Sequence, residues 1–121
     1  MYRLGIIEES MDDMRVLRGL EPYFVSQRME EVSEDEFPLW HINEYHVPED
    51  KIRNIAELLQ HHIKETWYAH GFNDKNLIVA LKGKWFEVSL NRDETWNQMI
   101  EYGVTYARVE RQYLETIPLH I

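Results

Sequence analysis

The chain has 121 residues, 44% apolar and 29% charged, which is the composition of a single globular domain. Its 22 acidic and 13 basic residues give a net charge of −9, which disfavours general nucleic-acid binding and adsorption to anionic membranes. Cysteine is absent, so disulfide bridges, zinc–thiolate sites and cysteine nucleophiles are excluded.

The amino-terminal part is predicted to contain one helix among strands. Alternating and branched apolar residues predict strands over 2–7, 24–32 and 39–47. Ser10 with Asp13 resembles a capping box, and Pro22 is a stop signal, so we expect a helix over 10–21. The acidic stretch 33–36 is expected to form a turn between the second and third strands.

The clearest helix signal in the chain covers residues 48–64. Pro48 suits the first turn of a helix, where it removes no hydrogen bond. Apolar residues then recur with a helical period at Ile52, Ile55, Ala56, Leu59 and Ile63. This stripe is expected to pack onto a sheet.

Beyond residue 64 the pattern predicts a meander and a carboxy-terminal helix. The expected strands cover 66–72, 77–81 and 85–90. A cap at Asn91 or Asp93 then starts a helix, and Gly103 is expected to end it. A further helical stretch is expected within 104–117, followed by loose residues after Pro118.

The order of these elements predicts an α+β fold of one domain, residues 1–121. The first six elements match a ferredoxin-like β-α-β-β-α-β sandwich, extended by a β-hairpin and a third helix. The two earlier helices are expected to cover one face of the antiparallel sheet. The other face is free to meet the third helix, a ligand or another subunit.

A candidate ligand site follows from aromatic and ionisable residues on the expected strands. Its members are Trp40, His41, Glu44, Tyr68, His70 and Phe72. Alternation places Tyr68, His70 and Phe72 on one face of their strand, as one wall of a pocket. The competing interpretation is that these large side chains form the core or a dimer interface.

Two function classes follow from these residues. The first is a binding or protein-interaction domain that forms homo-oligomers and takes a small molecule in the aromatic and histidine pocket. The alternative is a small enzyme in which His70 or His41 acts with Glu44 in acid–base catalysis. The sequence leaves open whether the protein is an enzyme.

Neither a metal nor an organic cofactor is expected. The six histidines lack metal-binding spacing, and the five glycines form no phosphate-binding loop. No nucleic-acid or membrane partner is expected. The chain shows no apolar stretch typical of a signal peptide or a membrane span, which by default favours a cytoplasmic location.

Overall fold

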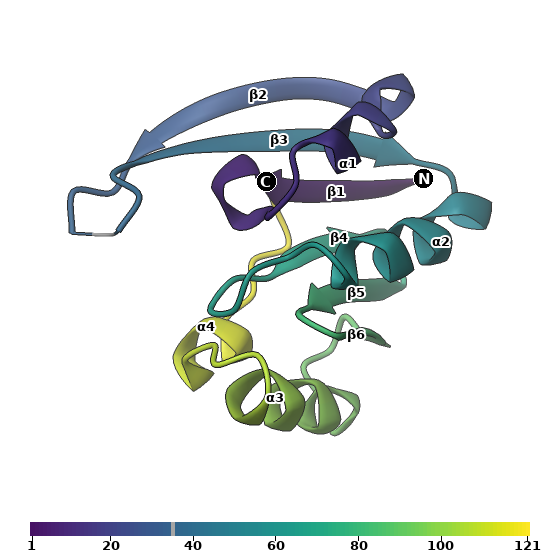
Figure 1. The fold of residues 1–121 in the computed structure, drawn as a ribbon. Helices are drawn as coiled ribbons and strands as arrows, with labels where there is room; N and C mark the ends of the chain where they lie inside the picture. Colours follow the sequence, from purple (N-terminus) through teal and green to yellow (C-terminus); the bar gives the residue numbers. More distant parts are fainter. Residues whose placement is uncertain (35) are drawn as a thin grey trace.

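A computed structural model of the chain describes residues 1–34 and 36–121, and its central feature is a six-stranded antiparallel sheet (Figure 1). The strands lie in the order β2-β3-β1-β4-β5-β6. Their bounds are β1 Tyr2–Ile7, β2 Phe24–Glu31, β3 Leu39–Val47, β4 Ala69–Phe72, β5 Asn76–Leu81 and β6 Lys84–Ser89. The helices are α1 Arg15–Arg18, α2 Glu49–Gln60, α3 Thr95–Thr105 and α4 Arg111–Glu115, with 3₁₀ turns at Glu8–Ser10 and Glu21–Tyr23.

The register of the central strand β1 defines two faces of the sheet. Leu4 lies opposite Tyr45 on β3 and Gly71 on β4, whereas Gly5 lies opposite Glu44 and His70. Because cross-strand partners share a face, Leu4 and Tyr45 belong to one face, and Gly5 and His70 belong to the other. We call these the first face and the second face.

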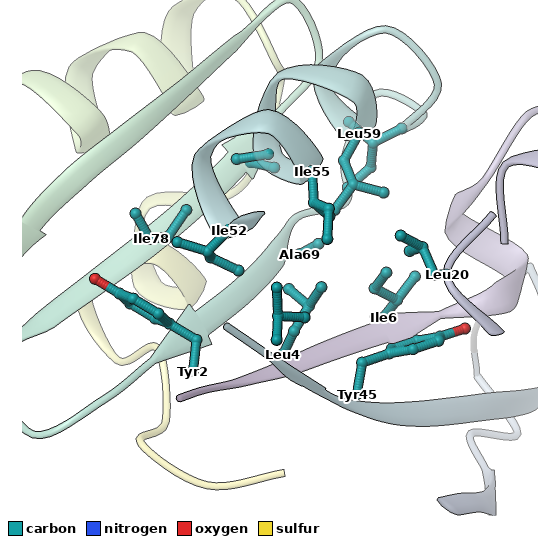
Figure 2. Packing of buried hydrophobic residues seen from close by; sticks show 14 of the residues in the cluster. Tyr2, Leu4, Ile6, Leu20, Tyr45, Ile52, Ile55, Leu59, Ala69 and Ile78 are labelled. Atoms are coloured by element: carbon teal, nitrogen blue, oxygen red, sulfur yellow. The ribbon is translucent and has the colours of Figure 1, made fainter. Parts of the chain in front are cut away.

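Helix α2 covers the first face. Its buried side chains Ile52, Ile55, Ala56 and Leu59 pack against Tyr2, Leu4 and Ile6 of β1 and against neighbouring strands (Figure 2). The period of the apolar stripe matches the helix, so one side of α2 is buried and the other is solvated. The expectation that this segment packs onto the sheet is confirmed.

The second face has a separate core formed by α3 and α4. Leu77, Val79 and Leu81 of β5 pack with Trp96 and Met99 of α3, together with Leu114 of α4. After α4 the chain returns toward β1, drawn in yellow in Figure 1. The second face therefore has one half covered by α3 and α4 and another half, around β1, β3 and β2, that the chain end approaches.

The α+β class is confirmed, and α2 and the strands other than β4 lie close to their predicted ranges. The strand predicted over 66–72 is shorter than expected, since β4 covers only Ala69–Phe72. The ferredoxin-like arrangement as a whole is not confirmed, because the sheet has a six-strand order and its helices occupy both faces. The predicted turn 33–36 includes residue 35, which lies outside the described residues. No helix in the described ranges combines the length and the apolar character needed to cross a bilayer.

The predicted helix over 10–21 is confirmed only over Arg15–Arg18, where α1 lies. Residues 8–23 instead contain two 3₁₀ turns around the four-residue α1. The hydroxyl of Ser10 donates to the carbonyl of Ile7 at 2.6 Å instead of capping a helix, and Met11 is extended in a bridge with Ile63. Tertiary pairing with the end of the α2 segment thus overrides the local capping signal.

The predicted helix end at Gly103 is wrong, since α3 continues to Thr105. A Cβ atom at this position would collide with the side chain of Leu114. Gly103 therefore serves helix packing, because its missing side chain lets α4 approach α3.

Candidate ligand-binding cavity

A cavity of about 560 Å³ lies on the second face, in the half that the helices leave uncovered. Its aromatic lining comes from three separate parts of the chain: Phe37 and Trp40, then Trp67, Tyr68 and His70, then Tyr113. Charged residues of both signs also line it: Arg28, Glu30, Glu36, Arg108 and Glu110. Gly5 and Ile7 of the central strand contribute the part nearest the middle of the sheet.

Two tryptophans form one wall of the cavity. The ring of Trp40 meets that of Trp67 edge to face, with centroids 5.0 Å apart. Phe37 extends this group, with its centroid 6.2 Å from that of Trp67. Edge-to-face and tilted pairs are favourable arrangements of aromatic rings, so the three rings form a continuous apolar wall.

His70 lies in a row of rings along β4. Its ring stacks on Phe72 at an interplanar angle of 20° and meets Tyr68 edge to face, each at a centroid distance of 5.9 Å. Desolvation lowers the pKa of His70 to about 4 and raises the pKa of Tyr68 to about 12. At neutral pH the imidazole is therefore uncharged and the phenol is protonated.

The end of the chain is held beside this row. Neutral His70 donates from Nε2 to the carbonyl of His120 at 3.2 Å. Arg28 donates from Nε and Nη2 to the main-chain oxygen of Ile121 at 3.2 and 3.1 Å. Gly5 leaves room for the Ile121 side chain, whose Cγ1 lies 3.1 Å from where a Cβ would be. Residues after Pro118 were expected to be loose, but these contacts fix them against β1, β2 and β4.

Two residues of the lining have left-handed backbone conformations. Thr66 has φ 73° and Arg108 has φ 57°. The segments are joined where the Thr66 amide donates to the carbonyl of Ala107 at 2.8 Å. A β-branched residue rarely adopts positive φ, and such strained positions cluster at functional sites.

The structure brings together only part of the predicted site. Trp40, Tyr68 and His70 line the cavity, and Phe72 packs behind His70 in the second-face core. The predicted pairing of Glu44 with a histidine of the pocket does not form. Arg3 donates to both carboxylate oxygens of Glu44 at 3.0 and 3.1 Å.

Glu44 and His41 are separated by their places on β3. His46 contacts the Glu44 carboxylate at 2.8 Å, and the hydrogen bonds from Arg3 lower the pKa of Glu44. His41 has the opposite strand parity and contacts Glu9 through its amide and its Nδ1, both at 2.7 Å. Burial raises the pKa of Glu9, but the hydrogen bonds from His41 outweigh it and leave that pKa lowered.

Sequence reasoning missed several residues of the cavity, among them Arg28, Thr66, Arg108 and Tyr113. No local pattern marks them, because they lie on an exposed strand, at two loop positions and on a short helix. Positive φ at Thr66 carries no signal of its own in a sequence. Within residues 1–34 and 36–121, no group of three or more histidine or acidic side chains is placed to hold a metal ion.

Comparisons of the chain with protein-family models, with curated proteins and with solved structures find no match. The geometry of the cavity is therefore the basis for a functional assignment.

Proposed function

We propose that this protein is a binding domain whose second-face cavity takes a small, uncharged aromatic molecule, and that the domain associates with itself. The observation that carries the proposal is the convergence of aromatic side chains from three separate segments on one cavity of about 560 Å³. Small-molecule sites usually have volumes of about 300–1,000 Å³ and apolar walls with a few polar groups.

The chemistry of the lining favours an uncharged ligand. His70 is neutral and Tyr68 is protonated at neutral pH, so the row along β4 offers ring faces and polar edges without a net charge. The charged residues of the lining include both signs and give no single preference. An aromatic ring would stack against Trp40 and Trp67, which are already oriented.

Backbone strain at Thr66 and Arg108 gives independent support. Both residues are in the lining, and each holds a conformation that costs free energy for a non-glycine residue.

The alternative of an acid–base enzyme has less support. Glu44 is held by Arg3 and His46, and His41 is paired with Glu9 on the other face. The residues that would share a proton are thus divided between different clusters.

The ligand proposal is tested with indole as a probe. Two-dimensional NMR of ¹⁵N-labelled protein monitors the binding of indole. A fragment of this size is expected to bind with a dissociation constant of about 1 mM. Chemical-shift changes should be largest at the side-chain N–H groups of Trp40 and Trp67. The side-chain N–H signals of Trp85 and Trp96 should stay unchanged.

Two exposed tyrosines supply a matched pair of variants. Tyr113 is 55% exposed and lines the cavity, whereas Tyr106 is 68% exposed and lies outside the lining. Tyr113→Ala should weaken indole binding several-fold, and Tyr106→Ala should leave it unchanged. Equal effects of the two substitutions, or no saturable shift at Trp40, would refute the cavity as the binding site.

Self-association is tested separately by sedimentation equilibrium of the unmodified chain. We expect a concentration-dependent dimer at micromolar protein. Monomer alone at high micromolar concentration would remove this part of the proposal and leave the cavity unaffected.

We also propose that β1–β4 with their two crossovers form a ferredoxin-like unit that the β5–β6 hairpin extends. The support is the partial order β2-β3-β1-β4, in which each crossover passes over one neighbouring strand. An experimental structure in which β1 does not lie between β3 and β4 would contradict this assignment.

A further inference from the structure

Strand β2 is a long open edge of the sheet. It stands at one end of the strand order, beside β3, at the outer margin in Figure 1. All eight of its residues are exposed, including the apolar Val25 and Met29, which are 47% and 65% exposed. Proline and lysine, which commonly protect an edge, are absent from Phe24–Glu31.

The regular part of this edge begins after a bulge. The register with β3 shifts between Phe24 and Ser26, and from Ser26 to Glu31 it is continuous. A regular strand of this length offers a continuous ladder of backbone groups to a new partner, whereas a bulged one would not.

The direction of the free backbone groups follows from one hydrogen bond. The amide of Val32 donates toward β3, to the carbonyl of Pro38 at 2.8 Å. Hydrogen bonding alternates along an antiparallel strand. The N–H and C=O groups of Gln27, Met29 and Glu31 therefore point away from β3, toward the open side.

We propose that the occupant of this edge is a second copy of the chain, paired antiparallel through β2 with the two-fold axis at Met29. This register places each Arg28 opposite Glu30 of the partner subunit. The pair falls at a position where side chains of neighbouring strands come closest, and opposite charges there are favourable. Met29 then lies opposite the partner subunit's Met29, and the two methionines cover each other.

The charges also exclude neighbouring registers. An axis at Arg28 would place arginine opposite arginine, and an axis at Glu30 or Glu31 would place glutamate opposite glutamate. Like charges directly opposite one another are destabilising. An axis at Gln27 avoids this but gives Arg28 no acidic residue across the axis, because Ser26 would lie opposite it. Arg28 would then keep only the ion pair with Glu30 of its own strand, at 3.2 Å.

This inference specifies the surface for the self-association proposed above and rests on that proposal. It also places the rims of two cavities next to each other, since Arg28 and Glu30 line the cavity of their own subunit. The two sheets would become one continuous sheet across the axis.

A cysteine cross-link tests the register. The chain has no cysteine, so Met29→Cys introduces a single thiol. In the proposed dimer the two Cα atoms at this position would be about 5.5 Å apart, within the range that a disulfide spans. Mild oxidation should convert most of the protein to a covalent dimer on a non-reducing gel.

Glu31→Cys is the matched control, because it lies on the same strand and faces the same side. Its thiol would lie opposite Gln27 of the partner subunit and far from its own copy, so it should cross-link at least tenfold more slowly. Equal cross-linking rates for the two variants would overturn the register.

Charge reversal tests the pairing without a covalent bond. Arg28→Glu and Glu30→Arg should each raise the dimer dissociation constant about tenfold or more, since each creates like-charge pairs. The double variant R28E/E30R restores opposite charges and should return the constant to within about threefold of the original. Failure of this restoration would overturn the proposal. Arg28→Glu and the double variant both lose the Arg28 contact with Ile121, so this loss cannot explain a difference between them.

The two levels of the proposal fail in different ways. A dimer that persists in both single variants and does not cross-link through Met29→Cys overturns the β2 edge and leaves self-association standing. A chain that stays monomeric at high micromolar concentration overturns both, while indole binding is measured independently of either.

Discussion

Tyr2 carries a buried hydroxyl that has no hydrogen-bond partner among the described residues. Its ring packs on the first face beneath α2, where Ile52 and Ile78 surround it (Figure 2). Burial of a hydroxyl without a hydrogen-bond partner costs free energy, whereas burial of a phenylalanine ring at the same place would not carry this cost.

Tyr2→Phe should therefore raise the free energy of unfolding by about 1 kcal/mol. Tyr45→Phe is the matched control, because the Tyr45 hydroxyl accepts a hydrogen bond from Nδ2 of Asn43 at 3.0 Å. The free energy of unfolding of Tyr45→Phe should therefore fall by about 1 kcal/mol. Urea denaturation of the original chain and the two variants measures these changes. A Tyr2→Phe variant less stable than the original chain would contradict the absence of a hydrogen-bond partner for the Tyr2 hydroxyl.

His70 makes stability depend on pH. Its pKa falls from 6.5 to about 4 in the folded chain. Between these values the unfolded chain binds a proton at His70 and the folded chain does not, so stability decreases as the pH falls from 6.5 to 4. Above pH 6.5 the effect is absent, because the imidazole is neutral in both states.

Urea denaturation at pH 7.5 and pH 5 should show this loss, and His70→Gln should reduce it because glutamine does not titrate. An NMR titration of the His70 ring protons measures the pKa directly. A midpoint near 6.5 would show that the ring is not desolvated.

At the residue scale, strand alternation was sufficient to place Tyr68 and His70 on one face, and both line the cavity. Trp40 was found by its residue type alone. Arg28 and Arg108 could not be predicted, because exposed arginines are common and only the tertiary fold brings these two to the cavity.

The element on which the first-face core depends is α2. Ile52 is fully buried, whereas Leu58 on the same helix is 39% exposed. Ile52→Ala should cost about 2–5 kcal/mol of unfolding free energy, since it removes packed methyl groups and leaves a cavity. Leu58→Ala should change it by less than about 0.5 kcal/mol. Chemical denaturation of both variants tests the orientation of the helix, and similar losses would contradict it.

The elements differ in how far local sequence determined them. Strand β1 and helix α2 carry a strong period over their whole length, and both were predicted close to their observed bounds. The segment from Ser10 to Glu21 carries helical spacing as well, but Met11 is extended and pairs with Ile63, and only Arg15–Arg18 form a helix. A short amphipathic pattern cannot outweigh a long-range bridge that the sequence does not reveal.

At the scale of the whole molecule, the end of the chain joins the two halves of the second face. Its main-chain oxygens accept from Arg28 on β2 and from His70 on β4, strands that lie on opposite sides of β1. Removal of Leu119–Ile121 takes away these contacts and exposes His70 to water.

The truncated chain should show a His70 pKa shifted from about 4 toward 6.5, because desolvation is the main cause of the lowered value. It should also unfold at lower urea concentration than the full chain. Both quantities come from the NMR titration and the denaturation curves described above. An unchanged pKa would show that the strand residues alone desolvate the ring.

The α+β class could be predicted because the periods of the segments alternate clearly along the chain. The six-strand order, the coverage of both faces and the position of the chain end depend on contacts between distant residues. Gly103, for example, was expected to end a helix, and its actual contact is with Leu114 on α4.

The central place of β1 has a consequence for synthesis on the ribosome. Its residues are synthesised before those of both neighbours, whose partner residues on β3 and β4 follow at 42–47 and 70–72. Until those segments emerge, β1 has neither of its neighbouring strands beside it, and its apolar side chains lack their native partners. The sheet closes late, once the last of the two neighbours has left the exit tunnel.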